Sequence, residues 1–426
     1  MSDRTLVFRA QWVIPVSQPP IENGFVEVRE NTIVSVGQGT PPPGELRDLG
    51  HAAILPGLVN AHTHLEFSLL EQPLGQPGIS FPDWLRRVIA YRRDRDQQNS
   101  ENQAAAIDQG MVECRRVGTA LIGEITSQPW PLPTSTPCYS VCFLEQLGLL
   151  PGLVADRFES VSQRCDASSA ASAGCATSVG LSPHAPYSVH RDLLWRLMDW
   201  AGEKQLPLAI HLAETKEEIE LLGGQANALS DFLKDMGVWS GFDAFAQIEE
   251  ILNRLPQTGR HLLIHGHYFD ETHWSRLATM SDRISVVYCP RTHRFFGHDP
   301  YPLSCLIARG IPVAIGTDSR ASNPDLSVWK ELQTIANLHP DLPPHQIIRL
   351  GTLNGAWALN RDTHFGSLTP GKRAALNFIP FPSSTPALSL WSHFFAGNLC
   401  PIFGVPGDQT PIAPAQTWAM LSGLSN

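Results

Sequence analysis

The sequence predicts an α/β fold in which a (β/α)8 barrel stands beside a small β-sandwich domain built from both chain ends. Eight apolar runs alternate with amphipathic segments over residues 57–364. This is the pattern of parallel strands joined by crossover helices, and eight is the number of strands that closes a barrel. Short strand-like segments precede and follow that region. We therefore assign residues 1–56 and 365–426 to the β-sandwich and residues 57–364 to the barrel.

The N-terminal segment contains three strand-like stretches that alternate apolar and polar side chains, as half-buried strands do. They read LVFRAQWVIPV, GFVEVRENTIVSVG and AAILPG. Near the other end, FGSLTPGKRAALNFIPF resumes the same character. The tail beyond about residue 385 is rich in Trp, Phe and Pro, so we expect it to pack on the body of the protein.

Each of the eight apolar runs is expected to be a buried strand. In chain order they are GLVNAHTH (57–64), GTALIGEIT (118–126), YSVCFLEQLG (139–148), SVGLSPHAP (178–186), LPLAIHLAE (206–214), HLLIHGHY (261–268), ISVVYCP (284–290) and IPVAIGTD (311–318). Stretches such as FPDWLRRVIAYRRDRDQQ, HRDLLWRLMDWAGEKQ and SVWKELQTIANL carry apolar residues at helical spacing and are expected to be helices. The small-residue stretch DASSAASAGCATS (166–178) is expected to be a loop.

Composition argues against several classes of partner. The formal net charge is −10, whereas binding to nucleic acid phosphates needs a basic surface. No apolar run is long enough to cross a bilayer, and the first residues show no signal-peptide pattern. The eight cysteines are scattered without a CxxC pair, which favours reduced thiols. We expect a cytoplasmic protein that acts on a small molecule; homo-oligomerisation stays open.

Five side chains that bind metals stand at the ends of four of the runs. His62 and His64 alternate along the first run, so both point to one side of the strand. His211, His265 and Asp318 end the fifth, sixth and eighth runs. In a barrel these strand ends meet at the face that holds active sites. Imidazole and carboxylate suit a divalent transition metal, so the convergence predicts a metal site; the first two alone would equally fit hydrogen-bonded histidines in a polar loop.

Glu214 follows His211 by three residues, in HLAET. A bound cation lowers the pKa of its water, and attack by that water needs a carboxylate that transfers the proton. Glu214 is the candidate for this role; the alternative is a first-turn glutamate of the helix TKEEIELL. The fourth run continues as SVGLSPHAPYSVH, without a lysine or carboxylate to bridge two ions. One divalent ion is therefore expected, and zinc and iron(II) both fit the ligand set.

As a set, GLVNAHTH, SPHAPYSV, HLAET, IHGHY, CPRT and GTDS, in this order and spacing, resemble the amidohydrolase superfamily. They are most similar to its cytosine/guanine/adenosine deaminase and chlorohydrolase branch. HTHLEFS with FPDWL, and CPRT with GTDSRASNPDLS, look nearest to the aminodeoxyfutalosine deaminase-like proteins. The resemblance covers essentially the whole chain and implies hydrolytic deamination of a purine-like or related N-heterocyclic small molecule, with release of ammonia.

The resemblance also implies a role for each residue of the site. The implied metal ligands are His62, His64, His211 and Asp318. Glu214 becomes the proton shuttle, and His265 positions the hydroxide or polarises the reacting group. Asp318 also accepts a proton from the attacking water. Three alternatives stay open: displacement of another leaving group such as chloride, hydrolysis of a cyclic amide, and a non-catalytic protein that binds a metal for stability.

Three further residues are candidate substrate contacts. His184, at the end of the fourth run, contacts substrate or stabilises a Pro-containing turn. Glu66 is expected to reach a ribose hydroxyl or a ring nitrogen. Arg291 clamps an anionic group or holds its own loop by pairing with carboxylates.

The stretch THRFFGHDPYPL (292–303) departs from the family pattern, which has a shorter loop after CPR. We expect this longer loop to place two histidines and two phenylalanines over the substrate pocket. His267 stands two residues after His265 and competes with it for the same role; the family pattern favours the first of the two.

Overall fold

The computed structural model describes residues 5–98, 100–127, 139–172, 177–381 and 390–401. Eight parallel strands stand at its centre, in two four-stranded sheets. The first sheet holds β6 (Leu58–Thr63), β7 (Thr119–Thr126), β8 (Tyr139–Gln146) and β9 (Thr177–Pro183). The second holds β10 (Ala209–Leu212), β11 (His261–His265), β12 (Ile284–Tyr288) and β13 (Val313–Ile315). Seven strands lie within their predicted runs, and β9 begins one residue before its run, so the α/β class with parallel strands is confirmed.

The two parallel sheets touch at both of their edges. A parallel bridge pairs Leu181 at the edge of the first sheet with Leu208, which precedes β10. A second parallel bridge pairs Thr63 of β6 with Asp318, just after β13. The first and last of the eight strands are therefore neighbours, although about 250 residues separate them.

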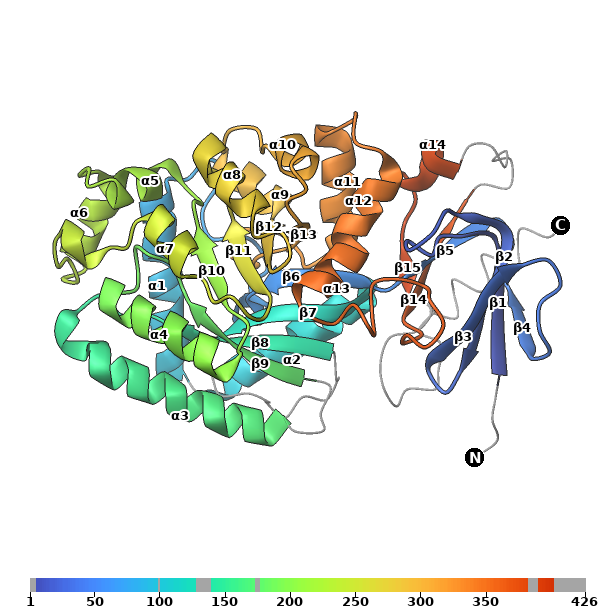
Figure 1. The fold of residues 1–426 in the computed structure, drawn as a ribbon, viewed down its shortest axis with the longest axis horizontal. Coiled ribbons are helices and arrows are strands. Elements are labelled where there is room, and N and C mark those ends of the chain that lie inside the picture. Colours follow the sequence, from blue (N-terminus) through green and yellow to red (C-terminus); the bar gives the residue numbers. More distant parts are fainter. Residues whose placement is uncertain (1–4, 99, 128–138, 173–176, 382–389, 402–426) are drawn as a thin grey trace.

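Among the described residues, helices lie between most successive strands and cover the outside of both sheets (Figure 1). The α-helices are α1 (Phe81–Gln98), α2 (Ser100–Arg116), α3 (Val154–Ser172), α4 (Arg191–Lys204), α5 (Lys216–Leu222), α6 (Ala228–Asp235), α7 (Ile248–Arg254), α8 (Glu271–Ala278), α9 (Pro290–Phe296), α10 (Leu303–Ala308), α11 (Val328–Leu338), α12 (Pro344–Arg349), α13 (Gly355–Ala358) and α14 (Leu390–Phe394). Short 3-10 turns span Leu65–Phe67, Pro151–Leu153 and Phe242–Ala244, and a π-helical turn spans Leu350–Asn354.

The loop predicted at residues 166–178 is wrong for its first part. Residues 166–172 continue helix α3, whereas the small-residue stretch was expected to be irregular. Alanine is the strongest helix former, and α3 packs along β8 and β9, so propensity and packing both favour the helix. Residues 173–176 of the same stretch lie outside the described residues.

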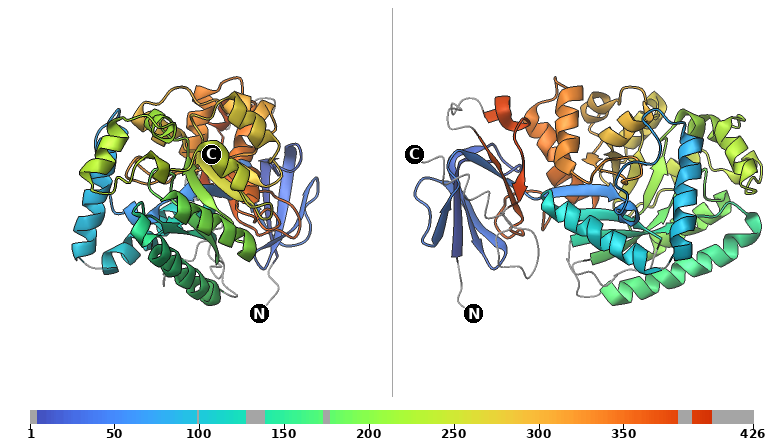
Figure 2. Two further views of the ribbon diagram at one scale, coloured as in Figure 1. Left: turned by 60° about the vertical axis from the view of Figure 1, so that its left-hand side comes forward. Right: turned by 180° about the vertical axis from the view of Figure 1, so that it is seen from behind.

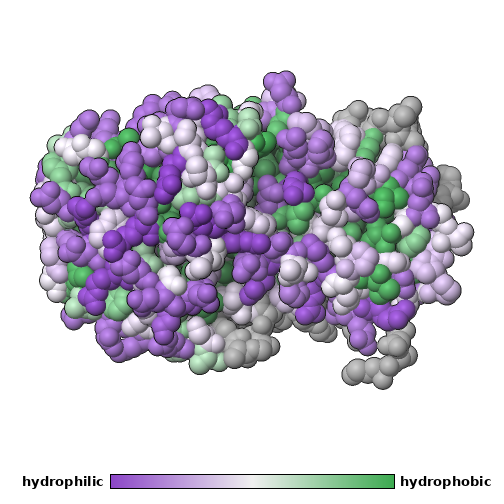
Figure 3. All heavy atoms as spheres, in the orientation of Figure 1, coloured by the Kyte–Doolittle hydropathy of each residue, from purple (hydrophilic) through white to green (hydrophobic). Residues whose placement is uncertain are grey.

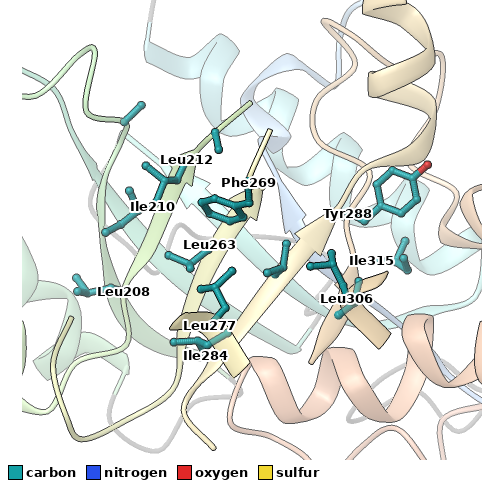
Figure 4. Packing of buried hydrophobic residues seen from close by; sticks show 14 of the residues in the cluster. Leu208, Ile210, Leu212, Leu263, Phe269, Leu277, Ile284, Tyr288, Leu306 and Ile315 are labelled. Carbon is teal, nitrogen blue, oxygen red and sulfur yellow. The ribbon is translucent and has the colours of Figure 1, made fainter. Parts of the chain in front are cut away.

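The core has two parts because successive side chains of a strand face opposite sides. Ile210 and Leu263 face outward into a large cluster with the helices. Figure 4 shows Leu263 near Leu277 of α8. Ala209 and Ile264, their neighbours in sequence, face inward and pack with residues of the other sheet, such as Val59 and Phe143.

The two chain ends meet in a mixed seven-stranded sheet. Its strands are β1 (Thr5–Val13), β2 (Ile21–Arg29), β3 (Thr32–Gln38), β4 (Glu45–Asp48), β5 (Ala52–Pro56), β14 (Leu376–Pro380) and β15 (Cys400–Pro401). The antiparallel pair β5–β14 joins the N-terminal and C-terminal segments, and a separate apolar cluster lies under the sheet. Figure 2 shows this sheet at one end of the parallel strands from two further directions.

The expected packing of the tail can be followed only in part. Helix α14 contributes Phe394 to the core beside Trp329, whereas residues 402–426 lie outside the described residues. The face of the molecule in Figure 3 is largely hydrophilic, with smaller apolar patches. In the part of the chain that the structure describes, no helix combines the length and the apolar character that a membrane span requires.

Gly123 of β7 provides a test of this packing. A Cβ atom added there would lie 2.3 Å from the main-chain oxygen of Ala61 and 2.8 Å from Leu359. Because that oxygen belongs to a buried strand, we expect Gly123→Ala to lower the free energy of unfolding by about 1–3 kcal/mol in a denaturant titration. Gly152→Ala is the control, since no described atom lies within 4 Å of its added Cβ. Equal unfolding free energies of the two variants would contradict the described packing.

Candidate metal centre and cavity

Three buried histidines converge at the carboxyl ends of the parallel strands. His62 and His64 come from the end of β6, and His211 from β10. One ring nitrogen from each lies within 4.8 Å of the others, and the Nε2 atoms of His64 and His211 are 3.3 Å apart. The predicted convergence of two distant strands on one point is therefore present in the structure.

Asp318 completes this group from the loop after β13. Its Oδ1 lies 3.5 Å from His62 Nε2 and 3.8 Å from His64 Nε2. Ser322 donates a hydrogen bond of 2.8 Å to the other carboxylate oxygen, which orients the group. Burial alone would raise the pKa of Asp318, but contact with His62 and the nearby His64 outweighs burial and holds this pKa well below its usual range.

The chemistry of these side chains fits a divalent transition metal. Both ring nitrogens of His62 and Nδ1 of His64 are buried and have no hydrogen-bond partner among the described residues. Leaving such atoms unpaired is costly, and a metal would satisfy them. Burial, followed by the neighbouring imidazoles, lowers the pKa of His64 and His211, which keeps both rings in the neutral form that binds metals.

Glu214 and His265 lie together beside the three histidines. Glu214 Oε1 is 3.5 Å from His265 Nε2, and both side chains are buried. Burial, with Asp318 and Glu218 nearby, raises the pKa of Glu214 well above its usual value. Burial lowers the pKa of His265 to about 3, so its ring is neutral. Helix α5 begins only after its cap Thr215, so Glu214 is not a residue of its first turn.

Three residues next to these strand ends adopt the left-handed backbone conformation. The φ angles are 55° at Ala213, 70° at His265 and 55° at Asp318. For residues with a side chain this conformation costs about 1–2 kcal/mol each, and such strain gathers at functional sites. The backbone therefore leaves the regular strand conformation beside the candidate site.

A cavity of about 660 Å³ opens above this group. His64, His211, Glu214, His265 and Asp318 contribute to its lining. Helices α1 and α6 supply an apolar wall: Trp84, Leu85, Val88, Ile89, Phe232 and Leu233. The space suits a flat, mostly apolar small molecule whose polar edge faces the histidines.

Two of the predicted substrate contacts, His184 and Glu66, differ in their position relative to the cavity. His184 lines the cavity, its Nδ1 lies 2.7 Å from the hydroxyl of Ser188, and burial lowers its pKa to about 4. Glu66 is buried and does not line the cavity; its carboxylate accepts hydrogen bonds of 2.6 and 3.2 Å from Arg92. Arg92 and Glu145 line the cavity in its place and are 3.1 Å apart.

Sequence reasoning missed Arg92 and Glu145. Glu145 stands at the end of the third run, in the position that draws attention to His211 in the fifth, and this was an available signal. Arg92 belongs to the charged stretch of α1, which reads as an ordinary solvent-exposed helix face. Its place in the cavity lining becomes clear only from the structure, where its guanidinium lies between the carboxylates of Glu66 and Glu145.

Arg291 does not line the cavity. Its guanidinium donates to both carboxylate oxygens of Asp325, at 2.7 and 3.2 Å, and lies 3.7 Å from Glu331. Its main-chain N–H also donates to Glu331, at 2.9 Å. Both carboxylates are provided by the chain itself, which supports the alternative that Arg291 holds its own loop.

The expectation for residues 292–303 is wrong in two respects. Residues Pro290–Phe296 form helix α9, begun by a proline in its first turn, and none of the loop lines the cavity. Phe296 packs on Trp84, which lines the cavity, while Nδ1 of His293 lies 2.9 Å from Nδ1 of His267. His267 does not line the cavity either, so it does not compete with His265.

The family model described as "Amidohydrolase family" matches residues 53–413. The chain belongs to the amidohydrolase family. This confirms the family resemblance inferred from the motifs around these strand ends.

Individual amidohydrolases extend the comparison. A 5-methylthioadenosine/S-adenosylhomocysteine deaminase of Moorella thermoacetica is 27% identical over 384 residues, which cover 85% of this chain and 83% of that protein. The structure of Helicobacter pylori aminofutalosine deaminase in complex with methylthio-coformycin has a TM-score of 0.78 at 22% identity, covering 92% of this chain and 96% of that one. An adenosine deaminase of Xanthomonas campestris with bound zinc has a TM-score of 0.72 at 21% identity, with coverage of 98% and 97%.

Metal binding by the three histidines is tested by thermal unfolding with and without zinc. A ligand that binds only the folded state at a thousand times its dissociation constant stabilises that state by about 4 kcal/mol. We expect zinc to raise the unfolding temperature of metal-free protein and His211→Asn to abolish most of this gain. His345→Gln, on the exposed surface of α12, is the control and should respond to zinc as the natural protein does. An unaltered zinc response in His211→Asn would contradict the site.

Proposed function

We propose that this amidohydrolase removes the exocyclic amino group of a purine-like N-heterocycle by hydrolysis and releases ammonia. One observation carries the proposal: a buried carboxyl with a raised pKa, Glu214, lies beside an ionised one, Asp318, in a cavity floored by histidines. One group can thus donate a proton while the other accepts one. The names of the compared deaminases support the same chemistry.

We infer that His62, His64, His211 and Asp318 would hold one divalent ion, zinc or iron(II). The zinc bound in the Xanthomonas campestris structure and the nitrogen-rich donor set of this chain support the assignment. When bound, the ion supplies a water-derived nucleophile near neutral pH.

The chain's own residues then manage the protons. Asp318 is ionised and accepts a proton from the attacking water, whose oxygen adds to the carbon that bears the amino group. Glu214, whose pKa is raised by burial, donates a proton to the adjacent ring nitrogen. The carbon–nitrogen bond breaks as Asp318 passes its proton to the leaving amino group, and the added hydroxyl becomes the oxo group by returning a proton to Glu214. The balance is one water consumed and one ammonia released, with an oxo group in the product.

His265 acts as a neutral polar contact in this scheme. Its ring lies 3.5 Å from Glu214 and is buried, so it orients the carboxyl and the reacting oxygen without carrying charge. We also propose that the ring of the substrate lies against the apolar wall from α1 and α6. His184, Glu145 and Arg92 then face its polar substituents, while Glu66 acts indirectly by holding Arg92.

The architecture expected from the sequence is part of the same proposal. We infer that the eight strands form one closed (β/α)8 barrel over residues 57–364, because parallel bridges join the two sheets at both edges and the inward side chains of both sheets share one cluster. We infer that residues 1–56 and 365–426 form the second domain. The pairing of β5 with β14 and their separate apolar cluster support this division.

Replacing Glu214 tests the proton donor. We expect Glu214→Gln to lower the rate of ammonia release by about 10²–10⁴-fold, because the amide keeps the shape but cannot donate and regain a proton. Metal content, measured by elemental analysis, should stay as in the natural protein. Glu217→Gln, in the first turn of α5, is the control and should keep full turnover. Unchanged turnover in Glu214→Gln would remove this residue from the mechanism.

Replacing Glu145 tests the substrate pocket. We expect Glu145→Gln to raise KM by about tenfold with a smaller change in kcat, because a hydrogen bond to a charged group is weakened on both Arg92 and the substrate. The measurement is the substrate dependence of ammonia release. Glu203→Gln on the exposed face of α4 is the control. An unchanged KM would exclude Glu145 from substrate binding.

A further inference from the structure

His265 is the last residue of β11, and its side chain points in a direction that the alternation along the strand does not predict. Along β11, Ile264 faces the inner cluster and Leu263 faces the helices. A regular strand would send His265 outward in the same way as Leu263. The left-handed φ of 70° at His265 breaks this alternation, and its imidazole lines the cavity next to Glu214. A residue with a side chain keeps such a conformation only when its surroundings stabilise it.

Tyr301 provides a contact of this kind. Its hydroxyl donates a hydrogen bond of 2.8 Å to the main-chain oxygen of His265, and both groups are buried. The next amide, that of Gly266, donates instead to Leu212 of the neighbouring strand at 2.9 Å. At the residue where the backbone becomes left-handed, the main-chain oxygen of His265 therefore accepts its hydrogen bond from the hydroxyl of Tyr301.

The ring of Tyr301 is itself held firmly. It stacks on Tyr288 with a centroid separation of 3.8 Å and an angle of 6° between the planes. Tyr288 is the last residue of β12, which pairs directly with β11. The hydroxyl of Tyr288 points away from the labelled aliphatic side chains in Figure 4. No hydrogen bond to this hydroxyl is found among the described residues, in contrast to that of Tyr301. The two stacked tyrosines therefore differ in that only the hydroxyl of Tyr301 contacts the chain at His265.

We propose that Tyr301 is a positioning residue for the active site, whose hydroxyl holds His265 in the left-handed conformation that directs its imidazole toward Glu214. Tyr301 does not line the cavity, so it acts through His265 and not on the substrate. The consequence for turnover rests on the proposed function. The placement of His265 does not. In this proposal, the long segment after CPR (292–303) contacts the main chain at His265 through Tyr301 and does not line the cavity.

A matched pair of variants tests the proposal in full-length, metal-loaded protein. Tyr301→Phe removes the hydroxyl bonded to His265, and Tyr288→Phe removes the hydroxyl of the other ring in the same stack. We expect Tyr301→Phe to lower kcat for ammonia release by about tenfold, with KM and metal content unchanged, because a buried carbonyl loses its partner. Tyr288→Phe should keep kcat within about twofold. Equal losses in both variants would overturn the proposal, since they would indicate disturbance of the stack.

A second measurement does not require turnover. In protein labelled with ¹⁵N-histidine, the ring signal of His265 is identified by its loss in His265→Gln. We expect that signal to shift in Tyr301→Phe and to stay in place in Tyr288→Phe. An unshifted His265 signal in Tyr301→Phe would overturn the positioning role. Absence of ammonia release by the unaltered protein would count against the proposed function instead, and the histidine spectrum would still decide the role of Tyr301.

Discussion

The contact between the first and last parallel strands is the constraint on which the site depends. The main-chain oxygen of His62 accepts hydrogen bonds from the N–H groups of Thr317 and Asp318, both at 3.1 Å. The Thr63 hydroxyl donates to the main-chain oxygen of Asp318 at 3.0 Å. These bonds fix the carboxylate beside the two histidines of β6. Gly316 is required next to them, because a Cβ there would lie 2.9 Å from the same His62 oxygen. Without this contact, residues far apart in the chain would not form one metal-binding group.

Burial gives this group its chemical character. Burial lowers the pKa of His211 and keeps its ring neutral, and burial also raises the pKa of Glu214. Contact with the imidazoles keeps Asp318 ionised. The pKa values of two carboxyl groups in one small space are thus shifted in opposite directions, which favours moving a proton in both directions during a reaction. The cost of burying these polar groups is consistent with a site that is completed by a cation.

Much of the fold and of the metal group was predictable from the sequence, because both depend on local regularities. Buried strands leave continuous apolar runs, and parallel strands bring their carboxyl ends to one face, so the position of His211 in its run already indicates the site. The rest depends on packing between distant segments. Nothing local distinguishes Arg92 from other arginines of α1, and nothing local shows that Asp325 supplies the partner of Arg291. The small-residue end of α3 misled because its composition suits both a loop and a helix.

We propose that four side chains, those of His62, His64, His211 and Asp318, surround a single ion. Anomalous X-ray diffraction from crystals of zinc-loaded protein, recorded on both sides of the zinc absorption edge, tests it most directly. We expect one strong anomalous peak per chain, in contact with His62, His64, His211 and Asp318. A peak elsewhere, two peaks in the cavity, or an empty centre between these side chains in fully loaded protein would contradict it.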